Sequence, residues 1–522
     1  MAVTPSTTLI ACYFRSRIQR PANRKQMLRE SFVSSFAACE TRHSILSLTS
    51  SRARDSGPQQ NSRTATTWTL LLSGPDEPPV IAGPPCGSLA RLGAIARNRT
   101  LHDVLILYGV HGMVFLVPLF TTPFLARVLG PSEWGAYAIA QSFAIWTSMI
   151  VEYGFVLTGT REIARHRGQR ARLRRIVAGV QGAKVVLMVL NALLAFATFF
   201  IAPVLSVRPW HVFWAWVWSI AQGLSPLWYF QGREQMIRAV VPEGAGRVIA
   251  LVAMILFVRM PEHGALALAL QAFGAVTGSG VGLYYLYKDL PARQLSLRAS
   301  FRSLSFGFSM FLYRIASTFY TVLNVFLLGL SSGPLIVSCF AGAERLTSLA
   351  IASFWPFWRA LYPRVVRNLA NNAPEALRQV RLALLTTTLV GIAIALAFEL
   401  AAPYLMPLFL GTGYDQSISV LRLLAPVVPL AGITGACGIL LMVPLGRDRA
   451  FSYITAIAGI VNVLVALTLV PARPLLRMPV LVVTVEAFIT LAIIWSLRRI
   501  KADILALHLK SAVRLPTDLD ME

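Results

Sequence analysis

Between Leu101 and about residue 500, long apolar stretches alternate with short polar breaks. At a rise of 1.5 Å per residue, about 20 apolar residues make a helix that crosses the hydrocarbon core of a bilayer. Twelve stretches approach or exceed this length, and the pattern predicts an all-α polytopic membrane protein with about twelve transmembrane helices. In chain order the predicted spans are Val104–Leu125, Gly135–Leu157, Ala183–Leu205, Trp210–Phe230, Gly244–Val258, Gly264–Tyr287, Leu304–Leu330, Leu335–Trp358, Arg381–Pro403, Ser417–Val443, Ala450–Val470 and Pro479–Leu497.

The composition excludes an ordinary water-soluble enzyme. The chain of 522 residues is 56% hydrophobic and only 14% charged, whereas soluble domains carry about 25% charged residues. The formal net charge is +25, and the basic residues lie mainly near the N-terminus and in short breaks between apolar stretches. This distribution favours a membrane surface over nucleic acid as the partner of the basic residues. The five cysteines show no paired spacing, so neither a disulfide framework nor a zinc site is predicted.

The charge of the polar breaks predicts the orientation, because Lys and Arg accumulate on the cytoplasmic side of a membrane. Basic residues cluster after the second, sixth and eighth spans, and the intervening breaks are nearly bare. Both termini are therefore predicted to be cytoplasmic, with an even number of spans in the inner membrane. The densest cluster, after the second span, contains Arg161, Arg165, Arg167, Arg170, Arg172, Arg174 and Arg175.

Four regions follow from this pattern. Residues 1–100 are rich in Ser, Arg, Thr and Pro and poor in acidic residues, which favours a disordered tail or an upstream start codon chosen in error over an organellar transit peptide. Residues 101–300 hold the first six spans and residues 301–498 the second six. Residues 499–522 form a predicted cytoplasmic tail.

A weak internal repeat links the two sets of six spans. An offset of 203 residues aligns the stretch Tyr137–Gln141 with Phe340–Glu344, and Arg161 with Arg364. Because six is even, both halves would have the same orientation, as a parallel repeat requires.

Motifs for catalysis are missing from the apolar region. It contains no nucleophile beside a base, no carboxylate pair, no phosphate-binding glycine loop and no HExxH spacing, and its predicted external breaks are short. No metal or cofactor is predicted, and the sequence favours a transporter over an enzyme.

Three neighbouring motifs carry a resemblance to a known family. The stretch LGPSEWGAYA at 129–138, EYGF at 152–155 and TREIA at 160–164 resemble the polysaccharide transporter family, the Wzx-type flippases of the multidrug/oligosaccharidyl-lipid/polysaccharide exporter superfamily. Trp134 departs from the pattern, which usually has Tyr or Phe there.

The resemblance implies two six-helix lobes in a V around a central cavity. It further implies movement of a polyprenyl-pyrophosphate-linked oligosaccharide across the inner membrane for O-antigen, capsule or exopolysaccharide biosynthesis. Membrane lipids, a polysaccharide polymerase and the chain-length machinery are the other partners that it implies.

Ionisable residues at membrane depth are costly and therefore candidate functional residues. Arg314 and Arg345 lie near the predicted midplane of adjacent spans, where two guanidiniums could bind a pyrophosphate bidentately. Arg345 could instead pair locally with a carboxylate. His111 aligns with Arg314 at the offset of 203, and it is either a second substrate contact or a packed histidine.

Other polar residues leave alternatives open. Glu344 could neutralise Arg345, or bind a proton or Na⁺ as a coupling site. Glu152 could take the same coupling role or pair with a nearby arginine at the helix end. Asn191 and Asn324 could bind sugar hydroxyls or form hydrogen bonds between helices.

Three basic residues mark a candidate cytoplasmic entrance. Lys184 and Arg247 begin their predicted spans, and Arg161 lies just inside the membrane. They could attract the anionic headgroup of the substrate or anchor the chain to anionic lipid.

Two other functions remain open from the sequence. One is a drug/cation antiporter or a peptidoglycan-precursor flippase of the same superfamily. The other, from a different class, is a membrane-embedded glycosyltransferase or polysaccharide polymerase, which the short external breaks disfavour.

Overall fold

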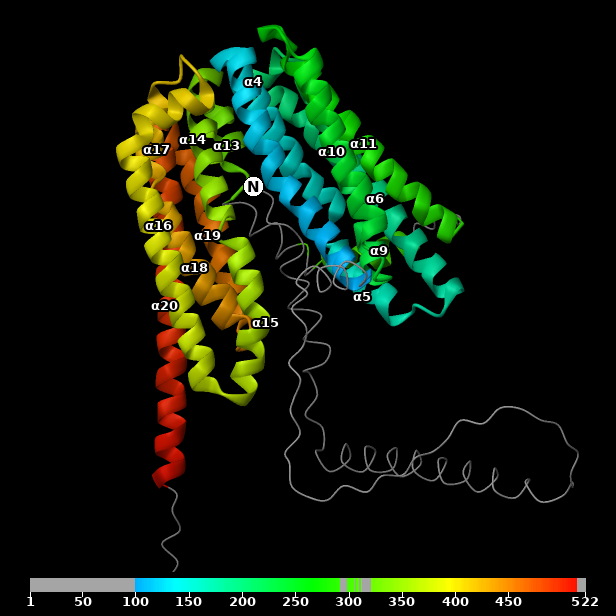
Figure 1. Ribbon diagram of the computed structural model, residues 1–522. Coiled ribbons are helices and arrows are strands. Elements are labelled where there is room, and N and C mark those ends of the chain that lie inside the picture. The colour runs from blue at the N-terminus through cyan, green and yellow to red at the C-terminus, as the bar shows by residue number, and fades with distance from the viewer. Residues whose placement is uncertain (1–98, 292–297, 306, 309–310, 312–320, 514–522) are drawn as a thin grey trace, which may run out of the picture. The chain divides into compact units, whose positions relative to one another are not determined.

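The computed structural model describes residues 99–291, 298–305, 307–308, 311 and 321–513. Within these residues every regular element is a helix and none is a strand (Figure 1). The predicted all-α class is therefore confirmed.

The first half of the chain begins with a bent helix, α4 (Arg99–Glu152). Its bend lies at Gly130, whose φ of 72° is in the left-handed region that glycine adopts without a steric penalty. Pro131 follows directly and starts the second segment with a preset φ. The LGP sequence is thus the turn that reverses the chain between the first two predicted spans. The remaining helices of this half are α5 (Phe155–Arg165), α6 (Arg170–Ile201), α7 (Pro203–Ser206), α8 (Pro209–Gly223), α9 (Leu227–Gly232), α10 (Ile237–Phe257), η1 (Pro261–His263) and α11 (Gly264–Asp289).

Glycines allow α10 and α11 to pack closely, side by side (Figure 1). A Cβ built on Gly246 of α10 would lie 2.1 Å from the carbonyl oxygen of Gly274 in α11. Small residues at such crossings let backbones approach each other, which stabilises helix pairs in membranes.

The second half repeats the helix order of the first. A short helix follows a break in both halves, α5 after α4 and α15 after α14, and a long helix comes next, α6 or α16. This order agrees with the predicted parallel repeat. The helices are α13 (Asn324–Ser331), α14 (Pro334–Ala352), α15 (Trp355–Asn371), α16 (Ala373–Leu410), α17 (Gln416–Leu424), α18 (Val427–Thr434), η2 (a π-helix, Gly435–Met442), α19 (Asp448–Thr468), η3 (Val470–Ala472) and α20 (Pro474–Val513).

Eight helical segments in the described part of the chain are long and apolar enough to cross a bilayer. They correspond to the third, fifth, sixth and eighth to twelfth predicted spans, and the chain is a multi-pass membrane protein. The first, second and fourth predicted spans lie on α4, α5, α8 and α9. The seventh, Leu304–Leu330, falls partly outside the described residues, so a total of twelve stays a prediction. The eight segments are Arg170–Ile201, Ile237–Phe257, Pro261–Asp289, Pro334–Leu369, Ala373–Leu410, Gln416–Met442, Asp448–Ala472 and Pro474–Arg499.

Two predicted spans begin later than the helices that contain them, because those helices start with polar residues. The helix α6 begins at Arg170 and not at Ala183, and α16 begins at Ala373 and not at Arg381. Hydropathy marks where a chain enters lipid, whereas a helix continues into water until a cap ends it. In α16 the cap is Asn372, whose side chain accepts a hydrogen bond from the backbone N–H of Glu375.

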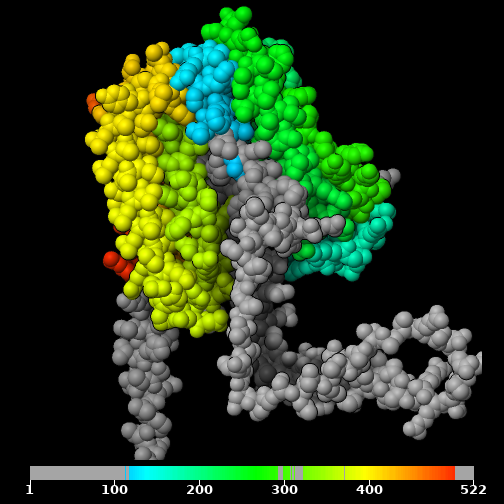
Figure 2. All heavy atoms as spheres, in the orientation of Figure 1, coloured from blue at the N-terminus to red at the C-terminus, as the bar shows by residue number. Residues whose placement is uncertain are grey.

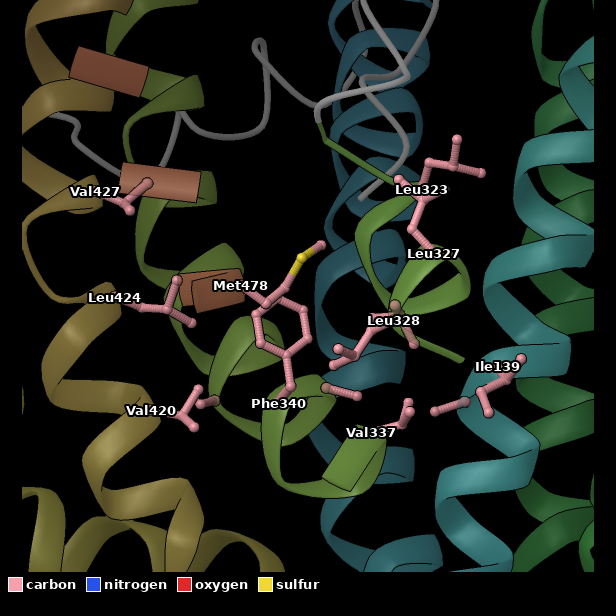
Figure 3. Packing of buried hydrophobic residues seen from close by; sticks show 14 of the residues in the cluster. Ile139, Leu323, Leu327, Leu328, Val337, Phe340, Val420, Leu424, Val427 and Met478 are labelled. Atoms are coloured by element: carbon pink, nitrogen blue, oxygen red, sulfur yellow. The ribbon is translucent and has the colours of Figure 1, made fainter. Parts of the chain in front are cut away.

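The helix α14 lies at the centre of the packing in the second half. Its Phe340 is fully buried, with Leu328 of α13 on one side and Leu424 of α17 on the other (Figure 3). It also packs against α4, so it joins the two halves of the chain. Large apolar side chains on α16 face outward on the yellow surface in Figure 2, as expected for contact with lipid. They include Leu385, Leu389, Leu396, Leu400 and Leu408.

Candidate functional site

A pocket lies between α4 and α14. These two helices carry the segments that the offset of 203 aligns, so the repeated segments meet at this pocket. Their close approach depends on Gly135 of α4, because a Cβ there would lie 1.9 Å from the carbonyl oxygen of Pro334 in α14. The polar side chains that line the pocket are Thr121, Thr122, Tyr137, Gln141, Ser142, Glu344, Arg345 and Ser348.

A chain of hydrogen bonds connects three helices at the pocket. Arg345 of α14 donates through Nη2 to Oε1 of Gln141 in α4. The Gln141 amide donates to the hydroxyl of Tyr137 at 3.0 Å, and this hydroxyl donates to Oε1 of Gln271 in α11 at 2.7 Å. Tyr137 is buried, and Gln141 and Arg345 are half-buried. The network fixes the position of the Arg345 guanidinium relative to both halves of the chain.

Within the part of the chain that the structure describes, no carboxylate lies within 4.0 Å of the Arg345 guanidinium in an ion pair. Its hydrogen-bond partner there, Gln141, is a neutral amide. Placing a cation at membrane depth costs about 2.5–3.5 kcal/mol on insertion scales. A guanidinium that is held by a neutral amide therefore still favours an anionic ligand. The planar fork can bind two oxygens of a phosphate group at once.

Glu344 lines the same pocket but has different partners. The amide of Asn324 in α13 lies 3.5 Å from Oε1 of Glu344, and Asn462 of α19 donates to Oδ1 of Asn324 at 2.9 Å. No salt bridge within 4.0 Å joins Glu344 to Arg345 among the described residues, but the two side chains interact electrostatically. The local pairing considered from the sequence therefore stays a prediction. Asn324 thus links Glu344 of α14 to Asn462 of α19, which is the interhelical alternative considered from the sequence.

Of the other predicted substrate residues, Asn191 does not line this pocket. Asn191 is fully buried, donates to the carbonyl of Thr147 at 3.1 Å and accepts from Ser219 at 3.2 Å. It therefore joins α6 to α4 and α8, which is the interhelical alternative. The backbone of His111 belongs to α4, but the structure does not describe its side chain. Arg314 lies outside the described residues.

Lys184, which the sequence placed at a cytoplasmic entrance, belongs to α6, and its side chain is fully buried. Its ammonium donates to the carbonyl of Gly223 at 2.6 Å and to that of Ser225 at 3.1 Å. The break before Pro226 ends α8 and leaves these carbonyls without helical partners. Lys184 satisfies them, so its position corrects the entrance prediction.

Two acidic residues interact with this lysine. Glu152, at the end of α4, and Glu243 of α10 interact electrostatically with Lys184. The hydroxyl of Ser225 donates to Glu243. Arg247 lies one turn after Glu243 and is half-buried, whereas Arg161 is exposed on α5. Of the three predicted entrance residues, only Arg161 is exposed.

A second polar cluster joins the bend of α4 to the start of α8. Glu133 accepts from Arg208 at 3.0 Å and lies 2.9 Å from Nε2 of His211. Burial raises the pKa of Glu133, but the hydrogen bonds and charges of His211 and Arg208 outweigh burial, and the net pKa is lowered. Glu133 also packs against Gly264, where a Cβ would meet its side chain at 2.5 Å. The cluster ties together three elements at this end of the helices.

Tyr137, Gln141 and Gln271 were not predicted as site residues. The signal that could have identified Gln141 is the internal repeat, because the offset of 203 aligns it with Glu344. Tyr137 lies one helical turn before Gln141, on the same face. Gln271 has no such signal, because a single glutamine in an apolar span is equally typical of a helix contact.

Comparisons with known proteins bear on this site. Residues 100–369 match the family described as polysaccharide biosynthesis protein. A protein of Escherichia coli (strain K12) named "Putative O-antigen transporter" is 28% identical over 365 residues, which cover 69% of this chain and 88% of that protein. A protein of the same name from Shigella dysenteriae is 24% identical over 371 residues, covering 70% of this chain and 92% of that protein.

A solved structure shares the fold. It is the inward-facing conformation of a multidrug resistance MATE family transporter of the MOP superfamily, with a TM-score of 0.54 and 17% identity. The likeness covers 74% of this chain and 95% of that one. The helical architecture is therefore that of a known class of membrane transporters.

Proposed function

Because the chain belongs to the polysaccharide biosynthesis protein family, we propose that it is a flippase for a polyprenyl-pyrophosphate-linked oligosaccharide. The substrate would cross the inner membrane on its way to a surface polysaccharide such as O-antigen, capsule or exopolysaccharide. The names of the two relatives from enteric bacteria support this substrate class.

The observation that carries the proposal is the Arg345 guanidinium in the pocket between α4 and α14. A pyrophosphate and its sugar hydroxyls are costly to bring bare into hydrocarbon, and a polar pocket can replace their water. Arg345 would bind the pyrophosphate, while Gln141 and Tyr137 would orient the guanidinium and offer hydrogen bonds to sugar hydroxyls. The polyprenyl tail would remain in the bilayer throughout.

The orientation of the chain follows from the same proposal. The arginines from Arg161 to Arg175, on α5, on the start of α6 and between these helices, are exposed. Their exposure supports a cytoplasmic position for this part of the chain and for both termini. The substrate would then enter from the cytoplasmic side, where its synthesis ends, and leave on the outer side.

The test is surface polysaccharide export in cells that depend on this chain. We expect Arg345→Ala to abolish export while the amount of protein in the membrane is unchanged. Arg345→Lys keeps the charge but loses the planar fork, and should restore export only in part. Arg367→Ala, which removes an exposed arginine of α15, is the matched control and should export normally. Normal export by Arg345→Ala would refute the assignment.

One observation favours a second function. Glu344 gives the pocket a carboxylate beside the guanidinium, and a carboxylate could bind a cationic drug in an antiporter. Resistance to cationic dyes that depends on Glu344, without any change in surface polysaccharide, would support this alternative.

A further inference from the structure

Glu486 is a buried carboxyl that lies away from the pocket lining. It belongs to the membrane-spanning part of α20 and is only 8% exposed. Its carboxyl shares a hydrogen bond with the hydroxyl of Thr434, the last residue of α18. The hydroxyl of Thr434 lies 3.0 Å from that of Thr490, one turn after Glu486 on α20. The three side chains therefore form one small polar group between two helices.

No basic side chain compensates this carboxyl among the described residues. The elements packed against α20 are α13, α14, α17, α18, α19, η2 and η3. Among the residues that the structure describes, Thr434 acts on the Glu486 carboxyl, and no salt bridge to this carboxyl is found. The ionisable residues on these elements are Cys339, Glu344, Arg345, Arg422, Cys437, Asp448, Arg449 and Tyr453.

An uncompensated charge in this environment is costly, so the carboxyl must hold a proton or a bound cation. Metal cations that bind oxygen take about six or more oxygen ligands. Two hydroxyls and one carboxyl supply too few, and the Thr490 hydroxyl already donates to the backbone carbonyl of Glu486 at 2.8 Å. The chemistry of the group therefore favours a proton.

Thr434 lies where α18 ends and an irregular helical segment begins. The π-helix η2 begins at Gly435, directly after Thr434, and π-helices are rare and frequently occur at functional sites. Two aromatic rings pack against η2. A Cβ on Gly435 would lie 2.1 Å from the ring of Trp358 in α15, and one on Gly438 would lie 2.6 Å from Phe451 in α19. A change in the hydrogen bond between Glu486 and Thr434 would thus act on a junction that α15 and α19 both contact.

We propose that Glu486, Thr434 and Thr490 form a proton-binding site in the second half of the chain, and that binding and release of this proton accompany the transport cycle. The second clause rests on the proposed function, whereas the site itself does not. The group is separate from the pocket, because none of its three residues lines it.

Infrared spectroscopy of the purified full-length protein in lipid vesicles tests the site without any substrate. A protonated carboxyl gives its own carbonyl-stretch band. We expect this band in the wild-type spectrum near neutral pH, its loss on raising the pH, and its absence in Glu486→Gln. Glu262→Gln, which changes an exposed carboxylate before α11, should leave the band unchanged. If Glu486→Gln removes no band, or if the band does not titrate, the site is refuted.

Export in cells tests the coupling. Glu486→Gln keeps the hydrogen-bonding shape of the protonated acid but cannot release a proton, so we expect loss of export with normal membrane abundance. Wild-type export by this variant would overturn the coupling and leave the carboxyl a structural hydrogen-bond acceptor.

Glu486→Asp keeps an ionisable group, and export by this variant that still responds to the pH gradient would support the coupling. Export driven by a Na⁺ gradient and insensitive to pH would refute it. Failure of the proposed function is recognised separately, because Arg345→Ala would then export normally while the infrared band of Glu486 still titrated.

Discussion

The contact between Gly135 and Pro334 offers a direct test of how the two halves are held together. A Cβ on Gly135 would lie 1.9 Å from the Pro334 carbonyl oxygen, 2.7 Å from its carbonyl carbon and 3.1 Å from its Cα. All three neighbours are backbone atoms, so no side chain can rotate away. Since C–H···O contacts need about 3.3 Å or more, Gly135→Ala forces α4 and α14 apart locally by roughly 1 Å.

Such overpacking costs about 1–3 kcal/mol of unfolding free energy. The displaced helices are those that the hydrogen bond from Arg345 to Gln141 connects. We therefore expect Gly135→Ala to lower the thermal unfolding midpoint in detergent and to reduce polysaccharide export beyond what any loss of protein explains.

Gly280→Ala is the matched control. Gly280 is also helical, and a Cβ there meets nothing within 4 Å. Since alanine favours a helix over glycine by about 1 kcal/mol, this variant should be as stable as the wild type or slightly more stable. Equal midpoints for Gly135→Ala and Gly280→Ala would refute a close backbone contact between α4 and α14.

Three further predictions concern other parts of the chain. Lys184→Met should lower the unfolding midpoint, because leaving the carbonyls of Gly223 and Ser225 without a donor costs about 1–3 kcal/mol; an unchanged midpoint would contradict the role of the lysine. The lowered pKa of Glu133 means that its ionised form stabilises the fold above the unfolded-state pKa of about 4.3, and that this contribution is lost as the pH falls through the folded pKa. Glu133→Gln should accordingly lower the midpoint at neutral pH and weaken its decline in acid, and an unaltered pH profile would count against the cluster. A reporter that is active only outside the inner membrane should be silent when inserted at Gly168, and a strong signal would reverse the proposed orientation.

The sequence was sufficient for the fold class and for most helices, because long apolar stretches at membrane length have few alternative structures. It also predicted a break between the first two spans, and the structure places Gly130, with its positive φ, in that break. It failed for Lys184, because the predicted span began where the apolar residues begin, whereas α6 begins a few turns earlier at Arg170. That shift moves Lys184 from the helix end into the buried interior.

The site was predictable only in part. Arg345 and Glu344 stand out as charges in an apolar span, and the structure brings both to the pocket. The described hydrogen-bond partner of Arg345, Gln141, is uncharged, and hydropathy does not distinguish a neutral Gln141 or Tyr137 from an ordinary helix contact. Glu486 is a single carboxyl in an apolar stretch, but its burial against Thr434 depends on how α18 and α20 pack. Helix packing of this kind is set by side-chain shape and is not contained in the periodicity of one chain.

The most direct test of the central claim is flipping of a fluorescent polyprenyl-pyrophosphate-linked oligosaccharide by the purified full-length protein in lipid vesicles. A membrane-impermeant quencher reports how much of the lipid remains in the outer leaflet. We expect wild-type protein to move the lipid between leaflets, and Arg345→Ala to leave it where it was added, while a polyprenyl lipid without the pyrophosphate is not moved by either. Equal flipping by wild-type protein and Arg345→Ala, or no flipping above protein-free vesicles, would contradict the account.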